Sequence, residues 1–140
     1  MSSIDLYYKG VSLTDLIGAS ADYVYNILGW PDYGTIIDGD LYEGGEYFAY
    51  EGGIALIIAY QTNYIGGIEG PTNTIEMNGA TLEKNRSELI GIFGMPESEG
   101  GGYDMMYEKY VYSMRFVLNG INIRFEMDSP DDKAYFFMAS

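Results

Sequence analysis

The segment SADYVYNILGWPD, Ser20 to Asp32, returns in similar form as NRSELIGIFGMPE, Asn85 to Glu97. Each copy begins with a residue type that caps helix N-termini, and apolar residues then recur at spacings of three and four. A glycine and a proline end each copy, as is common just beyond a helix. The sequence therefore predicts two short amphipathic helices, one in each half of the chain.

Alternating apolar residues predict antiparallel strands around these helices. The clearest hairpin joins Tyr110–Leu118 to Ile121–Met127 through Asn119–Gly120, a dipeptide that favours two-residue turns. A second hairpin is expected across Gly52–Gly53. Its strand Ile54–Tyr60 is apolar at nearly every position, which indicates cover on both faces. Further strands are expected at Ile4–Tyr8, Tyr64–Ile68, Thr74–Met77 and Ala134–Met138.

These elements predict an α+β protein of two tandem repeats, each a short helix packed on antiparallel strands. We expect residues 1–70 to form the first, acidic unit and residues 71–140 the second, within one compact domain. The Gly- and Pro-containing segment Glu69–Asn73 is interpreted as the linker between them, and Ser98–Gly102 as a flexible loop. Neither half has much apolar surface of its own, so their strands are expected to join or abut.

The charge of the chain is strongly negative, at −14. Residues 1–83 hold 12 acids and one base, Lys9, whereas residues 84–140 hold nine acids and six bases. Such a field repels nucleic acid and anionic membranes and attracts a basic partner. The alternative is that the acids only keep the protein soluble. The absence of cysteine excludes disulfides and thiolate chemistry, and the absence of histidine removes the usual proton shuttle at neutral pH.

The pattern Gly18-Ala19-Ser20, Val24, Ile27-Leu28-Gly29 and Pro31, followed by strands, resembles the repeat of β-lactamase inhibitor proteins. It is also similar to the small lipoprotein domain of the bacterial outer-membrane assembly machinery. The resemblance implies a non-enzymatic binding module that uses its sheet surface and loops. The second copy departs from the pattern at Glu83, which stands where the first has Gly18. The disulfides of the inhibitors and the lipid-bearing cysteine of the lipoproteins are absent here.

No motif of the sequence predicts catalysis, a cofactor or a metal. Paired acids such as Asp38 with Asp40 lie in Gly-rich segments, where carboxylates are usually solvated. Residues 32–43 have the length of a calcium-binding loop, but Gly34 and Ile36 occupy two of its ligand positions. We therefore expect a protein that is not an enzyme and has no cofactor.

Aromatic and acidic residues alternate in the first half, a composition that suits the binding of a basic protein. For Trp30 the alternative is packing under the sheet, in the place of its counterpart Met95. The predicted partner-binding residues are Trp30, Asp32, Tyr33, Asp38, Asp40, Tyr42, Glu43, Glu46 and Tyr47.

The sequence thus favours a protein-binding or inhibitory module, for example an immunity protein or an enzyme inhibitor, that engages a basic partner. Two alternatives remain open. One is an enzyme or small-molecule binder with a pocket between the repeats, and the other is a structural component of an assembly. A pocket of the first kind would be lined by Tyr25, Tyr47, Tyr50 and Tyr60. Because no export signal or apolar span is visible, we expect a cytoplasmic location.

Overall fold

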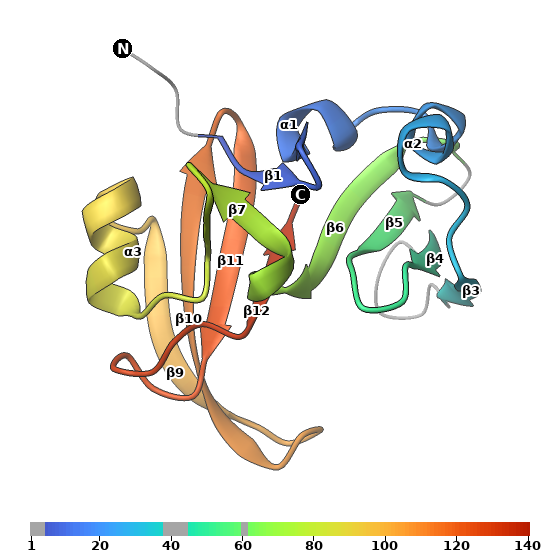
Figure 1. The fold of residues 1–140 in the computed structure, drawn as a ribbon. Coiled ribbons are helices and arrows are strands. Elements are labelled where there is room, and N and C mark those ends of the chain that lie inside the picture. Colours follow the sequence, from blue (N-terminus) through green and yellow to red (C-terminus); the bar gives the residue numbers. More distant parts are fainter. Residues whose placement is uncertain (1–4, 38–44, 60–61) are drawn as a thin grey trace.

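An eight-stranded antiparallel sheet connects the two halves of the chain (Figure 1). The computed structural model describes residues 5–37, 45–59 and 62–140, and all statements below refer to these. The strand order is β3-β4-β5-β6-β12-β11-β10-β9, so that β6 and β12 meet in the middle. The strands are β3 (Tyr33–Ile37), β4 (Gly45–Ala49), β5 (Ala55–Ala59), β6 (Ile65–Pro71), β9 (Ser98–Asp104), β10 (Lys109–Leu118), β11 (Ile121–Met127) and β12 (Phe136–Ala139).

A second, four-stranded sheet and three short helices cover one face of the large sheet. The order of the small sheet is β2-β1-β7-β8, in which Tyr7 of β1 pairs with Glu76 of β7. Its strands are β1 (Tyr7–Tyr8), β2 (Val11–Ser12), β7 (Ile75–Met77) and β8 (Ala80–Thr81). The helices are α1 (Leu13–Leu16), α2 (Ala21–Leu28), α3 (Arg86–Phe93) and the 3-10 turn η1 (Thr72–Thr74).

The predicted fold class, α+β with two helix-on-strand repeats, is wrong. The protein is mainly β, with two antiparallel sheets. The physical reason is the size of the helices. An eight-residue helix is about 12 Å long, whereas eight strands span about 34 Å across the sheet. Two such helices leave much of the sheet uncovered, and the small sheet, built from both halves of the chain, covers the remainder.

The local features of the two predicted helices are confirmed. Ser20 accepts a hydrogen bond from the amide of Tyr23, and Asn85 forms a reciprocal capping box with Glu88. Gly29 and Gly94 end the helices with φ of 83° and 84°, values that favour glycine.

The two predicted hairpins are also present, but two segments taken for loops are strands. β10 and β11 are joined by Asn119–Gly120, both at positive φ, and β4 and β5 by a turn at Gly52–Gly53. The expected linker Glu69–Asn73 instead begins inside β6, where Glu69 pairs with Met138. The expected loop Ser98–Gly102 is most of the edge strand β9.

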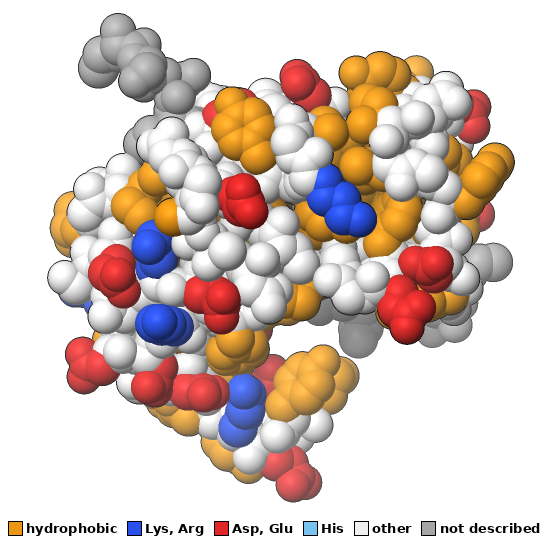
Figure 2. All heavy atoms as spheres, viewed as in Figure 1, with side chains coloured by type: hydrophobic (Ala, Val, Ile, Leu, Met, Phe, Trp, Pro, Cys, Tyr) orange, Lys and Arg blue, Asp and Glu red, His pale blue; other side chains and the backbone are white. Residues whose placement is uncertain are grey.

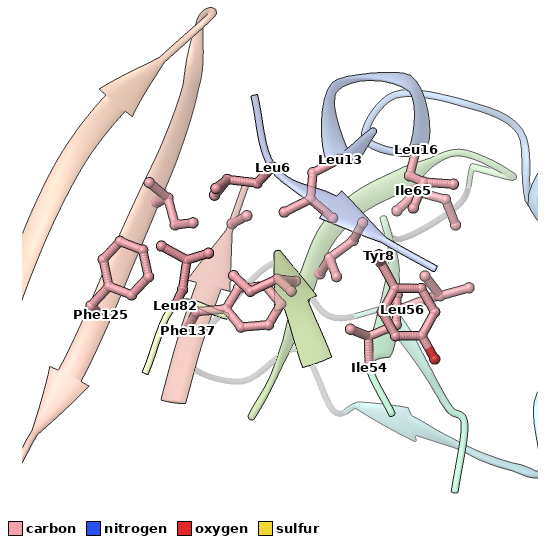
Figure 3. Packing of buried hydrophobic residues seen from close by; sticks show 14 of the residues in the cluster. Leu6, Tyr8, Leu13, Leu16, Ile54, Leu56, Ile65, Leu82, Phe125 and Phe137 are labelled. Carbon is pink, nitrogen blue, oxygen red and sulfur yellow. The ribbon is translucent and has the colours of Figure 1, made fainter. Parts of the chain in front are cut away.

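One hydrophobic core fills the space between the large sheet and its cover (Figure 3). Leu6, Leu13 and Leu16 enter it from the N-terminal part, opposite Leu56 and Ile65 of the large sheet. On the other side Phe93 of α3 packs on Phe116 and Phe125, with ring centroids 5.2 and 5.9 Å apart.

Tyr8 and Gly53 form a tight contact within this core. Tyr8 is 2% exposed, and its hydroxyl has no hydrogen-bond partner among the described residues. A Cβ atom on Gly53 would collide with that hydroxyl. We expect Gly53→Ala to destabilise the protein by about 1–3 kcal/mol through overpacking. Tyr8→Phe alone should be close to neutral, because it removes a buried polar atom that has no partner.

The double variant should lose less unfolding free energy than the two single variants lose in sum, because Tyr8→Phe removes the atom with which the new Cβ collides. Urea unfolding of the four proteins measures this coupling. Strict additivity would contradict the contact.

Candidate functional site

The face of the large sheet turned away from the core is the candidate site, and we call it the open face. Its side chains alternate with core residues along each strand. Arg124 and Glu126 flank the buried Phe125, and Phe136 and Met138 flank the buried Phe137. Glu69 follows the buried Ile68. This alternation is what a sheet covered on one side produces.

The strand register places the open-face residues in rows across the sheet. In one row Tyr33 pairs with Ala49, Ala49 with Ala55, and Ala55 with Glu69. The same row continues from Glu69 through Met138 and Arg124. Two alanines therefore separate Tyr33 from Glu69, and small side chains at these positions leave room above the sheet.

That room is a hollow of about 470 Å³, which we call the tyrosine hollow. Tyr33, Tyr47, Tyr107 and Tyr135 line it together with Phe136, and Ala49, Ala55 and Glu69 also contribute to its lining. Tyr107 reaches it from the turn of the β9–β10 hairpin, which extends beyond the rest of the sheet in Figure 1. In Figure 2 the surface is notched between the end of this hairpin and the body of the protein.

A second hollow of about 400 Å³ adjoins the first, and we call it the charged hollow. The two share Glu69, Tyr107, Tyr135 and Phe136. The bases of the charged hollow are already paired. Arg124 contacts Glu126 at 2.6 Å, and Lys109 contacts Asp128 at 3.1 Å and lies 4.3 Å from the centroid of the Tyr135 ring.

The hairpin turn that carries Tyr107 is held by Asp104. The Oδ1 atom of Asp104 accepts hydrogen bonds from the amides of Met106 and Tyr107, at 2.9 and 3.2 Å. The turn nevertheless exposes large apolar side chains: Met105 and Met106 are each 83% exposed and Tyr107 is 70% exposed. Exposed apolar groups held by an ordered turn are typical of interaction sites.

Glu69 lies where the two hollows meet, and its surroundings disfavour the ionised form of its carboxyl group. Burial raises the pKa of the carboxyl above its ordinary value, Glu126 raises it further, and Arg124 partly opposes them. Within the described part of the chain, Glu69 forms no hydrogen bond or ion pair through its carboxylate. Its neighbours on the adjacent strands are Ala55 and Met138, whose side chains have no group that could pair with a carboxylate.

The pKa of a tyrosine in the hollow is also shifted by these surroundings. Burial raises the pKa of the Tyr47 phenol, and Glu69, Tyr33 and Tyr107 add to the effect. Residues from β3, β4, β6 and the hairpin turn thus act on one another across the tyrosine hollow. The site is an aromatic-lined depression built by both halves of the chain, and Glu69 is the one charged residue among the described residues that line the tyrosine hollow.

The residues predicted from sequence are divided between two surfaces. Tyr33 and Tyr47 line the tyrosine hollow. Trp30 instead lies against Tyr25 of α2, with ring centroids 5.0 Å apart, and is 78% exposed. Its counterpart Met95 is 72% exposed, so neither residue packs under the sheet.

Among the other predicted residues, Asp32 accepts a hydrogen bond from the amide of Glu51. Glu46 is exposed and acts on the pKa of Tyr25. The predicted site residues Asp38, Asp40, Tyr42 and Glu43 lie outside the described residues.

The second half of the chain also contributes side chains to the site, which its sequence did not indicate. The polar alternation of β10 and β11 put Arg124 and Glu126 on one face, but nothing local shows that this face adjoins Glu69. The pairing of β6 with β12 brings them together. Of the four tyrosines expected to line a pocket, Tyr47 and Tyr50 border the tyrosine hollow, Tyr25 packs on Phe48, and Tyr60 lies outside the described residues.

In residues 5–37, 45–59 and 62–140, no three acidic side chains are grouped closely enough to hold a metal ion. Among the described helices, none combines the length and the apolar character needed to cross a membrane. A small pocket beside Asp5 and Leu13 measures about 20 Å³, room for little more than one water molecule.

Comparison with known proteins bears on the fold alone. No family model and no curated protein matches the sequence. The fold is similar to the 1.5 Å crystal structure of an extracellular protein containing an SCP domain from Bacillus anthracis str. Ames, with a TM-score of 0.64 and 8% identity. The match covers 91% of this chain and 44% of the other, so the chain spans less than half the length of that structure.

The raised pKa of Glu69 has a consequence for stability. The folded protein binds the Glu69 proton more tightly than the unfolded chain does, so the free energy of unfolding falls as pH rises through the raised pKa. Glu69→Gln removes this loss. We expect the variant to be more stable than wild type at pH 7, with the difference shrinking as pH falls from the raised pKa to the ordinary glutamate pKa and staying constant below it.

Urea unfolding at several pH values measures the difference. Glu76→Gln, at an exposed residue of β7, removes the same charge from the small sheet and serves as the control. Equal pH profiles for the two variants would contradict the buried state of Glu69.

Proposed function

We propose that this protein is a binding or inhibitory module that engages a basic protein partner through the open face of its large sheet. The observation that carries the proposal is the tyrosine hollow, where exposed aromatic rings surround a carboxylate that has no direct partner among the described residues. Tyrosines supply large, rigid contact area with a polar end and are enriched at interface hot spots. An immunity protein and an enzyme inhibitor are two concrete forms of such a module.

The charge of the chain supports the choice of a basic partner. At −14 the protein attracts cationic proteins over long range and speeds their association. The open face adds a local reason. The described bases that line the charged hollow, Lys109 and Arg124, are each paired with an acid, and the attraction of Arg124 offsets the carboxylate of Glu69 only in part.

The β9–β10 hairpin is the second contact region of the proposal. Its turn presents Met105 and Met106 beside Tyr107, all strongly exposed, next to the hollow. Methionine adapts to irregular surfaces and is frequent at binding sites. A partner seated in the hollow would therefore also cover this turn.

A small-molecule binder remains a second candidate, favoured by the volume of the tyrosine hollow. About 470 Å³ lies within the range of ligand pockets, roughly 300–1,000 Å³. A third alternative is a structural component of an assembly that pairs through an exposed strand edge. β3 and β9 are the edges of the described sheet, and the apolar strand β5 lies between β4 and β6.

The first experiment is capture of partners from an extract of the source cells, at low and at high salt, with the bound proteins identified. We expect a basic protein that is held at low salt and reduced at high salt. Its affinity is then measured by calorimetry with Tyr33→Ala and Tyr107→Ala. The affinity of each open-face variant for the partner should fall at least tenfold, because each substitution removes an aromatic ring of the hollow.

Tyr23→Ala is the matched control, because Tyr23 is half exposed on α2, which packs on the covered side of the sheet. It should bind as wild type does. Unchanged binding by both open-face variants would place the interface elsewhere. Capture of no basic protein at either salt concentration would refute the basic partner.

The acids predicted from sequence give a separate test of steering. Reversal of Asp38, Asp40, Glu43 and Glu46 to lysine should slow association and reduce its salt dependence, while the protein stays folded. Stopped-flow kinetics with the captured partner measures both. An unchanged association rate would remove long-range attraction by these residues from the proposal.

A cytoplasmic location, expected from the sequence, is also part of the proposal. The solved structure with a similar fold is described as that of an extracellular protein. Fractionation of the source cells with an antibody against this chain distinguishes the two locations.

A further inference from the structure

We propose that the tyrosine hollow is a subsite for the side-chain cation of one lysine or arginine of the partner, with Glu69 as its counter-ion. The inference rests on the proposed function and goes further, because it names the side chain that the partner buries. Three observations of the described residues lead to it: the position of Glu69, the state of the neighbouring charges and the aromatic walls.

Glu69 is the carboxylate that a cation entering the tyrosine hollow would meet. Among the described lining residues of this hollow it is the one acid, and no base accompanies it. It forms no ion pair or hydrogen bond within the described chain. The carboxylate would therefore repel an anionic ligand, and a neutral ligand would leave it unpaired in a partly buried site.

The adjoining charges do not compete for the same role. Arg124 is held by Glu126 at 2.6 Å and Lys109 by Asp128 at 3.1 Å. In the charged hollow Asp104 is engaged by the amides of its own turn. Glu69 is thus the acid of the two hollows whose charge is left without a direct partner, and a cation from outside can supply one.

The walls of the hollow suit the remainder of a basic side chain. Tyrosine rings attract cations through their faces, and their hydrocarbon surface packs against the methylene groups of lysine or arginine. The protein already makes such a contact at the rim, where the Lys109 ammonium lies 4.3 Å from the centroid of the Tyr135 ring. The alanines Ala49 and Ala55 keep the space above the sheet clear for the incoming side chain.

The electrostatic cost of Glu69 in the free protein agrees with this role. Burial raises the pKa of the carboxyl, the nearby Glu126 adds to the effect, and Arg124 opposes it in part. A bound cation would lower that pKa again, because an opposite charge within contact distance favours the ionised form. Binding should therefore release a fraction of a proton near the raised pKa, and affinity should increase with pH across it.

The test uses three peptides with the full-length protein: acetyl-Gly-Lys-Gly-amide, acetyl-Gly-Arg-Gly-amide and acetyl-Gly-norleucine-Gly-amide. Norleucine has an unbranched aliphatic side chain without the charge. Binding is followed by chemical-shift changes in two-dimensional NMR at low salt. We expect weak, saturable binding of the lysine or the arginine peptide, with shifts centred on Glu69, Tyr33 and Tyr135. The norleucine peptide should produce no saturable shifts.

Glu69→Gln keeps the shape of the side chain and should weaken binding of the basic peptides at least tenfold. Glu76→Gln, which removes the same charge from the small sheet, should leave binding unchanged and controls for net charge. Equal binding of the norleucine peptide, or wild-type affinity in Glu69→Gln, would overturn the inference. Comparison of the lysine and arginine peptides shows which cation the subsite prefers.

These outcomes separate the inference from the proposed function. If a basic partner is captured through Tyr33 and Tyr107 but Glu69→Gln binds both the partner and the peptides as wild type does, the subsite is wrong and the function stands. If the basic peptides bind at Glu69 but no basic protein is captured, the subsite stands and the proposed function fails.

Discussion

The pairing of β6 with β12 is the interaction on which the rest of the structure depends. Four residue pairs, from Phe136 with Pro71 to Ala139 with Ile68, join strands that lie at the ends of the two halves of the chain. Without this ladder the strands of each half would form separate sheets, each with one more unpaired edge. With it, the sheet is wide enough to close a single core on one face and to form the open face on the other. Glu69 and Phe136 enter the site through this ladder, from opposite halves of the sequence.

The sequence analysis succeeded where structure is local and failed where distant pairing decides it. Caps at Ser20 and Asn85 and the turn at Asn119–Gly120 follow from the preferences of a few neighbouring residues. Glu69–Asn73 has the composition of a linker, yet its first residues belong to the central strand of the molecule. At Gly70 a Cβ atom would lie 3.2 Å from the Cα of Ile54, so the glycine that suggested a loop allows two strands to approach closely. The composition of a segment therefore does not show whether a glycine belongs to a loop or to a close contact between strands.

The candidate site, too, could be predicted from the sequence only in part. Two of its lining residues, Tyr33 and Tyr47, could be predicted, because they belong to an aromatic and acidic segment that suggested binding. Tyr107 and Tyr135 could not, because the pairing of β6 with β12 and the reach of the β9–β10 hairpin bring them there, and no spacing in the sequence encodes either. Trp30 was predicted for its residue type and is exposed, but it lies with α2, whose partner in the sheet is Phe48. Residue type therefore identified candidates, and tertiary structure decided which of them share one surface.

Attraction and anchoring are separate physical tasks in this protein, and different residues would perform them. A net charge of −14 acts over roughly one Debye length and is weakened by salt, so it governs how fast a basic partner arrives. Glu69 would act at contact distance from within an aromatic depression, where salt screens less, so in the proposed complex it would govern how long the partner stays. Natural proteins retain destabilising groups where function needs them. A carboxylate whose ionisation weakens the fold, and which has no direct partner among the described residues, is such a group. In the proposed complex its complement would be a cation of the partner.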